Sequence, residues 1–322
     1  MRGAPVIGRR ALLRGGAGAA LAGLLAGCTR APEPGAVTVA GGEPGGFYLE
    51  FASLLAEALT RHGVAQTAGA LETGGSLDNM DRLAAGEATL AITLADAAAE
   101  RLAGPAPSSA PGRLVALGKV YENYVHCIVR RNAGISTLAD LAGRSAAVGD
   151  PRAGTSLTAR RLIEASGIPE GSLREEPLGL NQGLAALRDG AVEALFWSGG
   201  VPTAAIASAS RELSLALLDL SPLIAPTRAR HGAFYDRVLI PDGTYAGIPA
   251  TWTVGVANLL LCREDLDAEV ARRTVELLLT RAAELVPRSS LGVQFLSPDT
   301  LINTAGIPLH PGAEAAYRAF HG

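Results

Sequence analysis

The sequence is poor in aromatic residues, cysteine and net positive charge, and it contains no long apolar run. Aromatic residues make up 4% of the 322 residues, and only three Cys are present. The formal net charge of −3 argues against a nucleic acid as partner, because phosphate binding needs clustered Lys and Arg. No apolar stretch approaches the roughly 20 residues that span a membrane. We therefore expect neither nucleic-acid binding nor a transmembrane helix in the mature chain.

Signatures of enzymes and of metal sites are also missing from the sequence. There is no GxSxG, HExxH or GxGxxG motif and no complete Walker lysine. The five His are scattered, and neither Cys127 nor Cys262 has a CxxC partner. Glu122 and His126, four residues apart on an expected strand, are more simply explained as a structural pair than as a catalytic one. We predict that the protein is not an enzyme and holds no metal and no cofactor.

The N-terminus has the features of an export signal. Residues 1–27 combine a positive region, a short Ala/Leu/Gly run and a small-residue cleavage site. Arg9 and Arg10 favour the twin-arginine route, although the ordinary secretory route stays open. The tetrad LAGC resembles a lipobox and predicts lipidation of Cys28, followed by a linker to residue 36. We expect a protein that is exported and lipid-anchored to the cytoplasmic membrane, facing the periplasm or extracytoplasmic space.

Two segments of the chain follow the same plan. Residues 37–63 and 145–167 each read as a β-strand, a Gly-rich turn and an amphipathic helix, with GGEPGG matched by GDPRAGT. A second echo follows each of them, in which a helix ends at Gly86 or Gly190 before a buried strand. The pattern predicts an α/β protein with two similar lobes and a ligand cleft between them.

Two long strands are expected to join these lobes. They are predicted at residues 118–131 and 251–265, which divides the chain into lobe 1 (37–125 plus 257–322) and lobe 2 (126–256). Two connecting strands make a hinge, and ligand-driven closure is the motion that a hinge allows. Since Cys127 and Cys262 fall on these strands, we predict that they lie within disulfide range or pack as neighbours.

The candidate ligand site consists of Gly-rich loops that follow strands and open helices. One of them, GDPRAGTS, has the glycine spacing of a P-loop but no lysine. Exposed amides at helix N-termini favour an anion, and glycines let it approach closely. The predicted ligand-binding residues are Gly45, Gly46, Tyr48, Gly75, Ser76, Arg152, Gly154, Thr155, Ser156, Trp197, Ser198 and Gly199.

Each type of side chain in this set also has a structural alternative. Ser76 can be the N-cap of its own helix, as can Thr155 or Ser156. Tyr48 and Trp197 can be core residues instead of walls for a small ligand. Arg152 can be a solvated loop residue instead of a carboxylate clamp. The number of such loops in one chain favours a binding site.

Several blocks of the sequence resemble, in order, the TAXI proteins, the solute-binding subunits of one class of tripartite TRAP transporters. They are AGGEPGGFYLEFASLLAEAL, LETGGSLDNMDRLAAGEATLAIT, VYENYVHCIVRRNAGISTLADLAGRSAAVGDPRAGTSLTARRLIEASGI, ALFWSGGVPTAAI and IPLHPGAEAAYRAF. The family's motifs fall on Gly45, Gly46, Phe47 and Tyr48, on Gly74, Gly75 and Ser76, and on Ala153, Gly154 and Thr155. Arg152 and Ala153 depart from the commoner small or hydroxyl residues, which leaves the ligand's identity open.

The resemblance implies a two-lobed, type II periplasmic-binding-protein fold. It implies capture of a small carboxylate, glutamate-like or a dicarboxylate, by cleft closure and delivery to TRAP-type membrane permease subunits. We expect a monomer. Two alternatives stay open: a binding protein of an ATP-driven importer of the thiamine-precursor or sulfonate type, and a ligand sensor for a membrane kinase.

Overall fold

The computed structural model of the chain describes residues 35–104, 112–287 and 296–322. The predicted export signal, Cys28 and nearly all of the linker lie outside the described residues, so their roles stay predictions. Across those three described ranges, no helix is both long enough and apolar enough to cross a bilayer.

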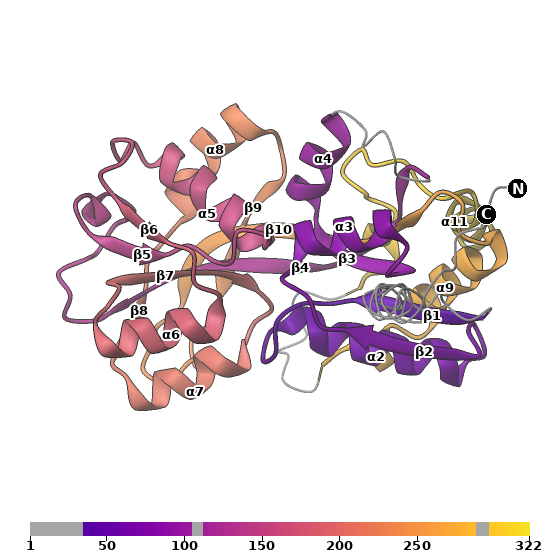
Figure 1. The fold of residues 1–322 in the computed structure, drawn as a ribbon, viewed down its shortest axis with the longest axis horizontal. Helices are drawn as coiled ribbons and strands as arrows, with labels where there is room; N and C mark the ends of the chain where they lie inside the picture. The colour runs from indigo at the N-terminus through magenta and orange to yellow at the C-terminus, as the bar shows by residue number, and fades with distance from the viewer. Residues whose placement is uncertain (1–34, 105–111, 288–295) are drawn as a thin grey trace, which may run out of the picture. The chain divides into compact units, whose positions relative to one another are not determined.

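The described chain alternates strands and helices around one mixed sheet (Figure 1). The first half consists of β1 (Ala36–Ala40), α2 (Phe47–Arg61), β2 (Thr67–Leu71), α3 (Ser76–Ala85), β3 (Leu90–Leu94), α4 (Ala95–Ala103) and β4 (Leu114–Arg130). The middle consists of the 3₁₀ turn η1 (Leu138–Leu141), β5 (Ser145–Ala147), α5 (Gly154–Ala165), β6 (Arg174–Glu176), α6 (Leu180–Asp189), β7 (Ala194–Gly199), α7 (Ala204–Glu212) and β8 (Leu215–Leu217). The remainder consists of η2 (Ser221–Leu223), α8 (Ile224–His231), β9 (Tyr235–Ile240), β10 (Thr251–Arg263), α9 (Ala268–Thr280), η3 (Ala282–Leu285), α10 (Pro298–Leu301) and α11 (Pro311–His321).

The strand order is β2-β1-β3-β10-β4-β7-β5-β6, with β8 added to β4 and β9 added to β10. We call the half built on β2-β1-β3 with helices α2 to α4, α9, α10 and α11 lobe 1. The half built on β7-β5-β6 with helices α5 to α8 is lobe 2. The strands β1, β5 and β7, which carry three of the Gly-rich loops, are short and largely buried, as parallel strands covered by helices are. The fourth such strand, β2, lies at the edge of the sheet and has no buried residue.

The two lobes repeat one topology, which confirms the repeat predicted from the sequence. In lobe 1, β1 lies parallel between β2 and β3, and β10 joins β3 antiparallel. In lobe 2, β5 lies parallel between β6 and β7, and β4 joins β7 antiparallel. The matching helices α3 and α6 both end at a left-handed glycine, Gly86 and Gly190, with φ of +74° and +76°. Glycine is needed at both positions, because a residue with a side chain would be strained at this positive φ.

Strands β4 and β10 pair with each other and pass through both lobes, as predicted for a hinge (Figure 1). Their ladder runs from Gly255 opposite Tyr124 to Arg263 opposite Leu114, and its register shifts after Asn258 and after Leu260. The residue numbers at which we divide the lobes stay a prediction.

The predicted proximity of the two cysteines is wrong. Cys127 and Cys262 are both buried and free. The ladder sets Cys262 opposite Val115, which lies twelve residues before Cys127 on β4. At about 3.3 Å per residue that distance is several times the roughly 7 Å that a disulfide allows. The error arose because the two strands are antiparallel, so equal distances along the chain do not place residues side by side.

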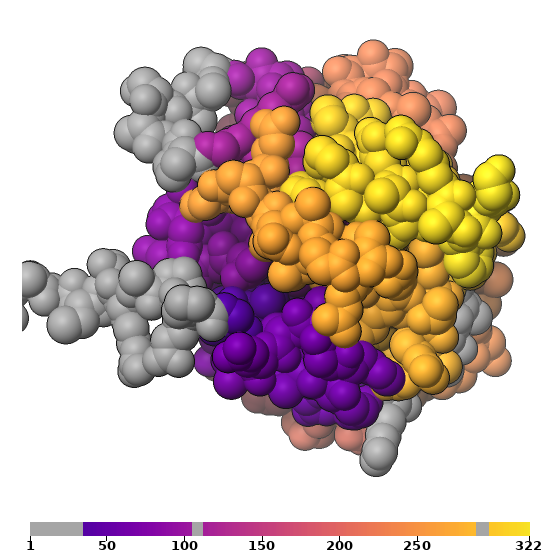
Figure 2. Space-filling view, turned by 90° about the vertical axis from the view of Figure 1, so that its right-hand side faces the viewer, coloured from indigo at the N-terminus to yellow at the C-terminus, as the bar shows by residue number. Residues whose placement is uncertain are grey.

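The C-terminal segment completes lobe 1. Figure 2 shows α9 and the yellow C-terminal residues spread over the indigo and purple residues of that lobe. Tyr317 on α11 donates to the carbonyl of Leu117, 2.8 Å away, on β4. A Cβ atom at Gly118 would lie 2.3 Å from the Tyr317 hydroxyl oxygen, so this approach requires glycine.

A buried charged cluster joins the two lobes beside the hinge. Asp96 at the start of α4 is fully buried and accepts hydrogen bonds from Arg161 on α5 at 3.1 Å and from Tyr235 on β9 at 3.0 Å. Arg161 also pairs with Glu100 of α4. Burial raises the pKa of Asp96, opposed by the Arg161 guanidinium and the Tyr235 hydroxyl. The contact between Asp96 and Arg161 therefore exists only while the lobes are together.

Replacing Arg161 by methionine should destabilise the described fold, because it leaves the carboxylate of Asp96 buried without its cation. Removing one partner of a buried pair costs about 3 kcal/mol or more. Arg160→Met is the matched control, since Arg160 on the same helix pairs with Glu175 at the surface, where an ion pair contributes less than about 1 kcal/mol. Chemical denaturation should separate the two variants, and equal losses would contradict this role of Arg161.

Candidate functional site

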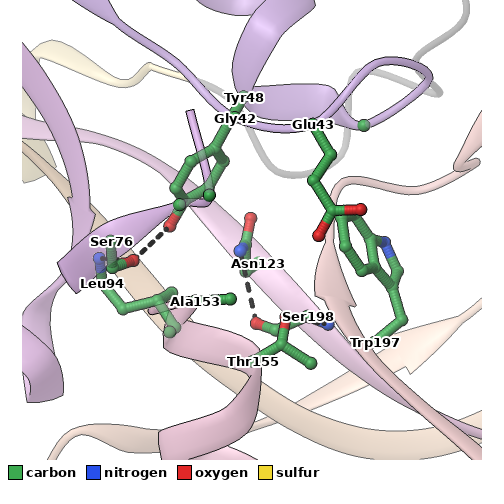
Figure 3. Close-up of a pocket in the computed structure, with 14 residues that line it drawn as sticks. Gly42, Glu43, Tyr48, Ser76, Leu94, Asn123, Ala153, Thr155, Trp197 and Ser198 are labelled. Atoms are coloured by element: carbon green, nitrogen blue, oxygen red, sulfur yellow. Dashed lines mark hydrogen bonds between the residues drawn. The ribbon is translucent and has the colours of Figure 1, made fainter. Parts of the chain in front are cut away.

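A cavity lies between the lobes where their Gly-rich loops meet (Figure 3). Its wall is formed by Gly42, Glu43, Gly46, Tyr48, Gly74, Gly75, Ser76, Leu94, Asn123, Ala153, Gly154, Thr155, Trp197 and Ser198. The cavity volume is about 30 Å³, on a scale where one water needs roughly 10–15 Å³. The lobes therefore leave only a small space between them, and a ligand of several atoms fits only when they move apart.

Most of the residues predicted from the sequence lie in this wall. Those that line it are Gly46, Tyr48, Gly75, Ser76, Gly154, Thr155, Trp197 and Ser198. Those that lie outside the lining are Gly45, Arg152, Ser156 and Gly199. The structure thus brings together residues from four loops of both lobes, and their binding of a ligand stays a prediction.

The hydroxyl groups of the cavity do not cap their own helices. The N-caps of α3 and α5 are Gly75 and Ala153, and neither makes a side-chain capping bond, so the predicted N-cap roles are wrong. Ser76 Oγ instead accepts a hydrogen bond from the amide of Leu94 at 3.1 Å. Thr155 Oγ1 accepts from the amide of Ser198 at 3.2 Å. Both hydroxyls therefore fasten a helix start to the end of a neighbouring strand at the cavity.

The two aromatic walls are held in place by hydrogen bonds. Trp197 is 8% exposed, and its indole Nε1 donates to Thr203 Oγ1 at 3.0 Å. The Tyr48 hydroxyl donates to Asn258 Oδ1 and lies 3.3 Å from Ser76 Oγ. Burial raises the pKa of Tyr48 well above its ordinary value, so the phenol is neutral at physiological pH. Each ring both packs in the interior and lines the cavity.

Close contact between the lobes depends on glycine at two facing positions. A Cβ atom at Gly154 would lie 2.6 Å from Ser76 Oγ and 2.7 Å from a Leu94 methyl carbon. Gly75, with φ of +113°, faces the backbone of Ala153, which a Cβ atom would approach to 3.3 Å. A side chain at either position would keep α5 and the start of α3 apart.

Two helix N-termini make hydrogen bonds that hold the lobes together. The carbonyl oxygen of Arg152 in lobe 2 accepts the amides of Leu77 and Asp78 at the start of α3, at 3.0 and 3.2 Å. In the reverse direction, the Glu43 carboxylate of lobe 1 accepts the amide of Leu180 at the start of α6, at 3.0 Å. These contacts occupy first-turn amides that have no acceptor within their own helix.

The Arg152 side chain pairs with Asp78 at 3.1 Å and is 59% exposed. Its guanidinium thus points to the rim of the closed cleft and bridges the lobes. Helix α5, by contrast, begins with Gly154 and Thr155 in the cavity wall. The amides of its first turn and the positive end of its dipole favour an anion there.

Sequence reasoning missed Glu43, Leu94 and Asn123, which also line the cavity. Asn123 is buried on β4 and its Nδ2 donates to Ser198 Oγ at 3.3 Å, whereas its Oδ1 has no hydrogen-bond partner among the described residues. Asn258 on β10 similarly leaves its Nδ2 unpaired within the described chain. An amide side chain in the middle of each hinge strand was the available signal, because buried polar groups are normally satisfied.

Glu122 and His126 do not pair, so the predicted structural pair is wrong. Glu122 pairs with Lys119 at 2.7 Å. His126 Nε2 lies 2.9 Å from the Tyr245 hydroxyl, and Nδ1 lies 2.9 Å from the carbonyl oxygen of Tyr124. Burial lowers the pKa of His126 to about 4, so the imidazole is neutral behind the site.

His126 should make the fold sensitive to acid. Because its pKa is about 4 in the folded state and near 6.5 unfolded, stability is complete above pH 6.5 and falls as the pH drops towards 4. The loss is about 3 kcal/mol over that window. His126→Gln should remove it in urea titrations between pH 7 and 4, whereas the exposed His321→Gln should not. An unchanged pH profile in His126→Gln would refute the assignment.

Three solved structures are similar to this chain, and the first of them supports this description of the fold. A solved structure of a protein from Bordetella bronchiseptica RB50 matches with a TM-score of 0.57 at 15% identity, covering 89% of this chain and 98% of that chain. The periplasmic aliphatic sulphonate binding protein SsuA from Escherichia coli matches with a TM-score of 0.47 at 15% identity, covering 89% and 79%. An amino acid ABC transporter substrate-binding protein from Streptococcus pneumoniae, bound to L-arginine, matches with a TM-score of 0.47 at 16% identity, covering 76% and 88%.

The fold, with a cavity between two lobes, is that of the two-lobed periplasmic binding proteins. The sequence model of the NMT1-like family matches residues 39–319. The chain therefore belongs to the NMT1-like family of periplasmic solute-binding proteins.

Proposed function

We propose that this protein captures a small carboxylate outside the cytoplasmic membrane by closing its two lobes, without chemical turnover. The observation that carries the proposal is the cavity whose wall contains the start of α5, three hydroxyl groups and two aromatic rings. The first-turn amides of α5 offer donors for a carboxylate, and hydrogen bonds to a charged group contribute about 1.5–3 kcal/mol each. A few such bonds account for a micromolar affinity, near −8 kcal/mol.

The predicted ligand residues fit this role as two groups. Gly154, Thr155 and Ser198 lie where the carboxylate would meet the start of α5, while Tyr48 and Trp197 would cover its carbon chain. The predicted residues that lie outside the lining, Gly45, Arg152, Ser156 and Gly199, would support the loops. Lipidation at Cys28 would keep the protein at the membrane as a monomer facing the periplasm or extracytoplasmic space.

The resemblance of its sequence to TAXI proteins favours delivery to TRAP-type permease subunits driven by an ion gradient. The alternatives are delivery of the ligand to an ATP-driven importer and ligand sensing for a membrane kinase. Reconstituted uptake separates them: ligand transport with an ion gradient and no ATP supports the TRAP assignment, and transport that needs ATP supports the importer.

Ligand binding should be visible with the purified chain. Thermal shift and calorimetry with amino acids, dicarboxylates, monocarboxylates and 2-oxo acids should give at least one stabilising ligand that is recovered unchanged. If no carboxylate in the panel binds, the proposed ligand class is wrong. If the ligand is consumed, the proposal of binding without turnover is wrong.

Gly154→Ala should block closure without unfolding either lobe, because the added Cβ meets Ser76 and Leu94 only when the lobes are together. We expect ligand affinity to fall at least tenfold, about 1.4 kcal/mol. Gly69→Ala on β2 is the control, since a Cβ there meets nothing within 4 Å. Calorimetric titration measures both variants, and unchanged affinity in Gly154→Ala would show that binding does not need this closed arrangement.

A further inference from the structure

The cavity wall contains one charged side chain among the described residues, and that side chain is acidic. Of the lining residues only Glu43 carries an acidic carboxyl group, whose pKa is raised by burial and lowered in part by the Leu180 amide, and Tyr48 is held neutral. Two cationic side chains lie near lining residues in the sequence, and both form ion pairs with residues outside the wall. Arg152 pairs with Asp78, and Lys119 pairs with Glu122. A site proposed for a carboxylate therefore has a carboxylate of its own and no described cation in its wall.

Glu43 is fixed in this position by contacts with lobe 2. Its Oε2 accepts the amide of Leu180 at 3.0 Å, and a Cβ atom at Gly179 would lie 2.6 Å from that oxygen. The loop of Glu43 is held again where Asn181 Nδ2 donates to the carbonyl of Pro44 at 3.0 Å. In the closed protein the carboxylate thus cannot swing away from a ligand without breaking the contact that holds the lobes together.

The Glu43 carboxyl group points into the cavity, so it lies close to a bound ligand. In Figure 3 the carboxylate hangs beside Trp197 into the space above Thr155 and Ser198, which lie at the start of α5 and the end of β7. A ligand carboxylate bound at α5 therefore leaves the other end of the molecule near Glu43. A second carboxylate placed there would meet a like charge in a water-poor space, where both groups cannot easily remain ionised.

We propose that Glu43 determines specificity by excluding ligands that carry a second carboxylate, so that the ligand is a small monocarboxylate whose far end is neutral or cationic. The inference rests on the proposed binding of a carboxylate and sharpens it. Discrimination arises from a repulsive element, which is a common way to separate ligands of similar size. Because the same carboxylate caps α6, a dicarboxylate would also oppose closure of the lobes.

The test uses acids that differ only at one end. In the five-carbon series, 5-aminopentanoate, glutaramate and glutarate share a carboxylate and end in an ammonium, an amide and a second carboxylate. In the four-carbon series, 4-aminobutanoate, succinamate and succinate do the same. Calorimetry with the full chain at pH 7 should show, in at least one series, the amide or ammonium acid binding at least tenfold more tightly than the diacid.

Glu43→Gln should reduce or invert the ratio of the two affinities, because the diacid should bind more tightly and the ammonium acid more weakly. Glu170→Gln is the matched control. Glu170 is an exposed glutamate that follows α5 and lies outside the cavity lining. It should leave the order of affinities unchanged.

A diacid that binds the unaltered protein as tightly as its amide would overturn the inference while leaving carboxylate binding intact. The same conclusion follows if Glu43→Gln and Glu170→Gln give equal affinity ratios. Binding by none of the six acids, and by no other carboxylate, would instead reject the proposed function and this inference with it. The affinity ratio of the unaltered protein is measured without any variant. The inference can therefore be tested even if Glu43→Gln misfolds.

Discussion

The antiparallel pairing of β4 with β10 is the interaction on which the rest of the structure depends. These two strands lie at the centre of the sheet, and each passes from one lobe into the other. They place β3 and β7 on opposite sides of the hinge, so the loops at the ends of both strands open into one cavity. Asn123 and Asn258 lie at this crossing, where the ladder also shifts its register. The hinge is therefore also the floor of the site.

Several of the contacts that hold the lobes together are polar, beside apolar ones such as that of Phe47 with Gly200, and polar contacts suit a protein that must open and close. Glu43 meets α6, Arg152 meets α3, and Asp96 meets Arg161. Burying such groups costs desolvation energy that roughly offsets the attraction between them, whereas an apolar interface would hold the lobes shut. Water replaces each of these partners when the lobes separate. A ligand that adds a few kcal/mol then decides which state is populated.

Local patterns in the sequence predicted the fold and much of the cavity wall. Strand, glycine turn and helix recur with fixed spacing, so the βα units around Gly42 and Gly149 and the buried strands that follow them were visible without coordinates. Ser76 and Thr155 were placed correctly in the wall because they follow such glycines. Their hydrogen-bond partners, Leu94 and Ser198, were not foreseen because they lie on strands distant in sequence.

Features that depend on one lobe meeting the other were beyond sequence reasoning. Glu43 reads as a turn residue, and only the tertiary structure brings it to α6 and into the cavity. Arg152 was predicted as a clamp for the ligand, but its partner in the closed protein is Asp78. Cys127 and Cys262 were misplaced because the direction of strand pairing is not written in local periodicity.

The most direct test of the account is the distance between the lobes with and without ligand. Spin labels at Asp81→Cys on α3 and Arg160→Cys on α5 would report it, in a chain with Cys28→Ser, because Cys127 and Cys262 are fully buried. The account predicts a long or broad distance distribution in the free protein that becomes short and narrow when a bound monocarboxylate saturates the site. An identical distribution in both states would contradict closure as the basis of binding.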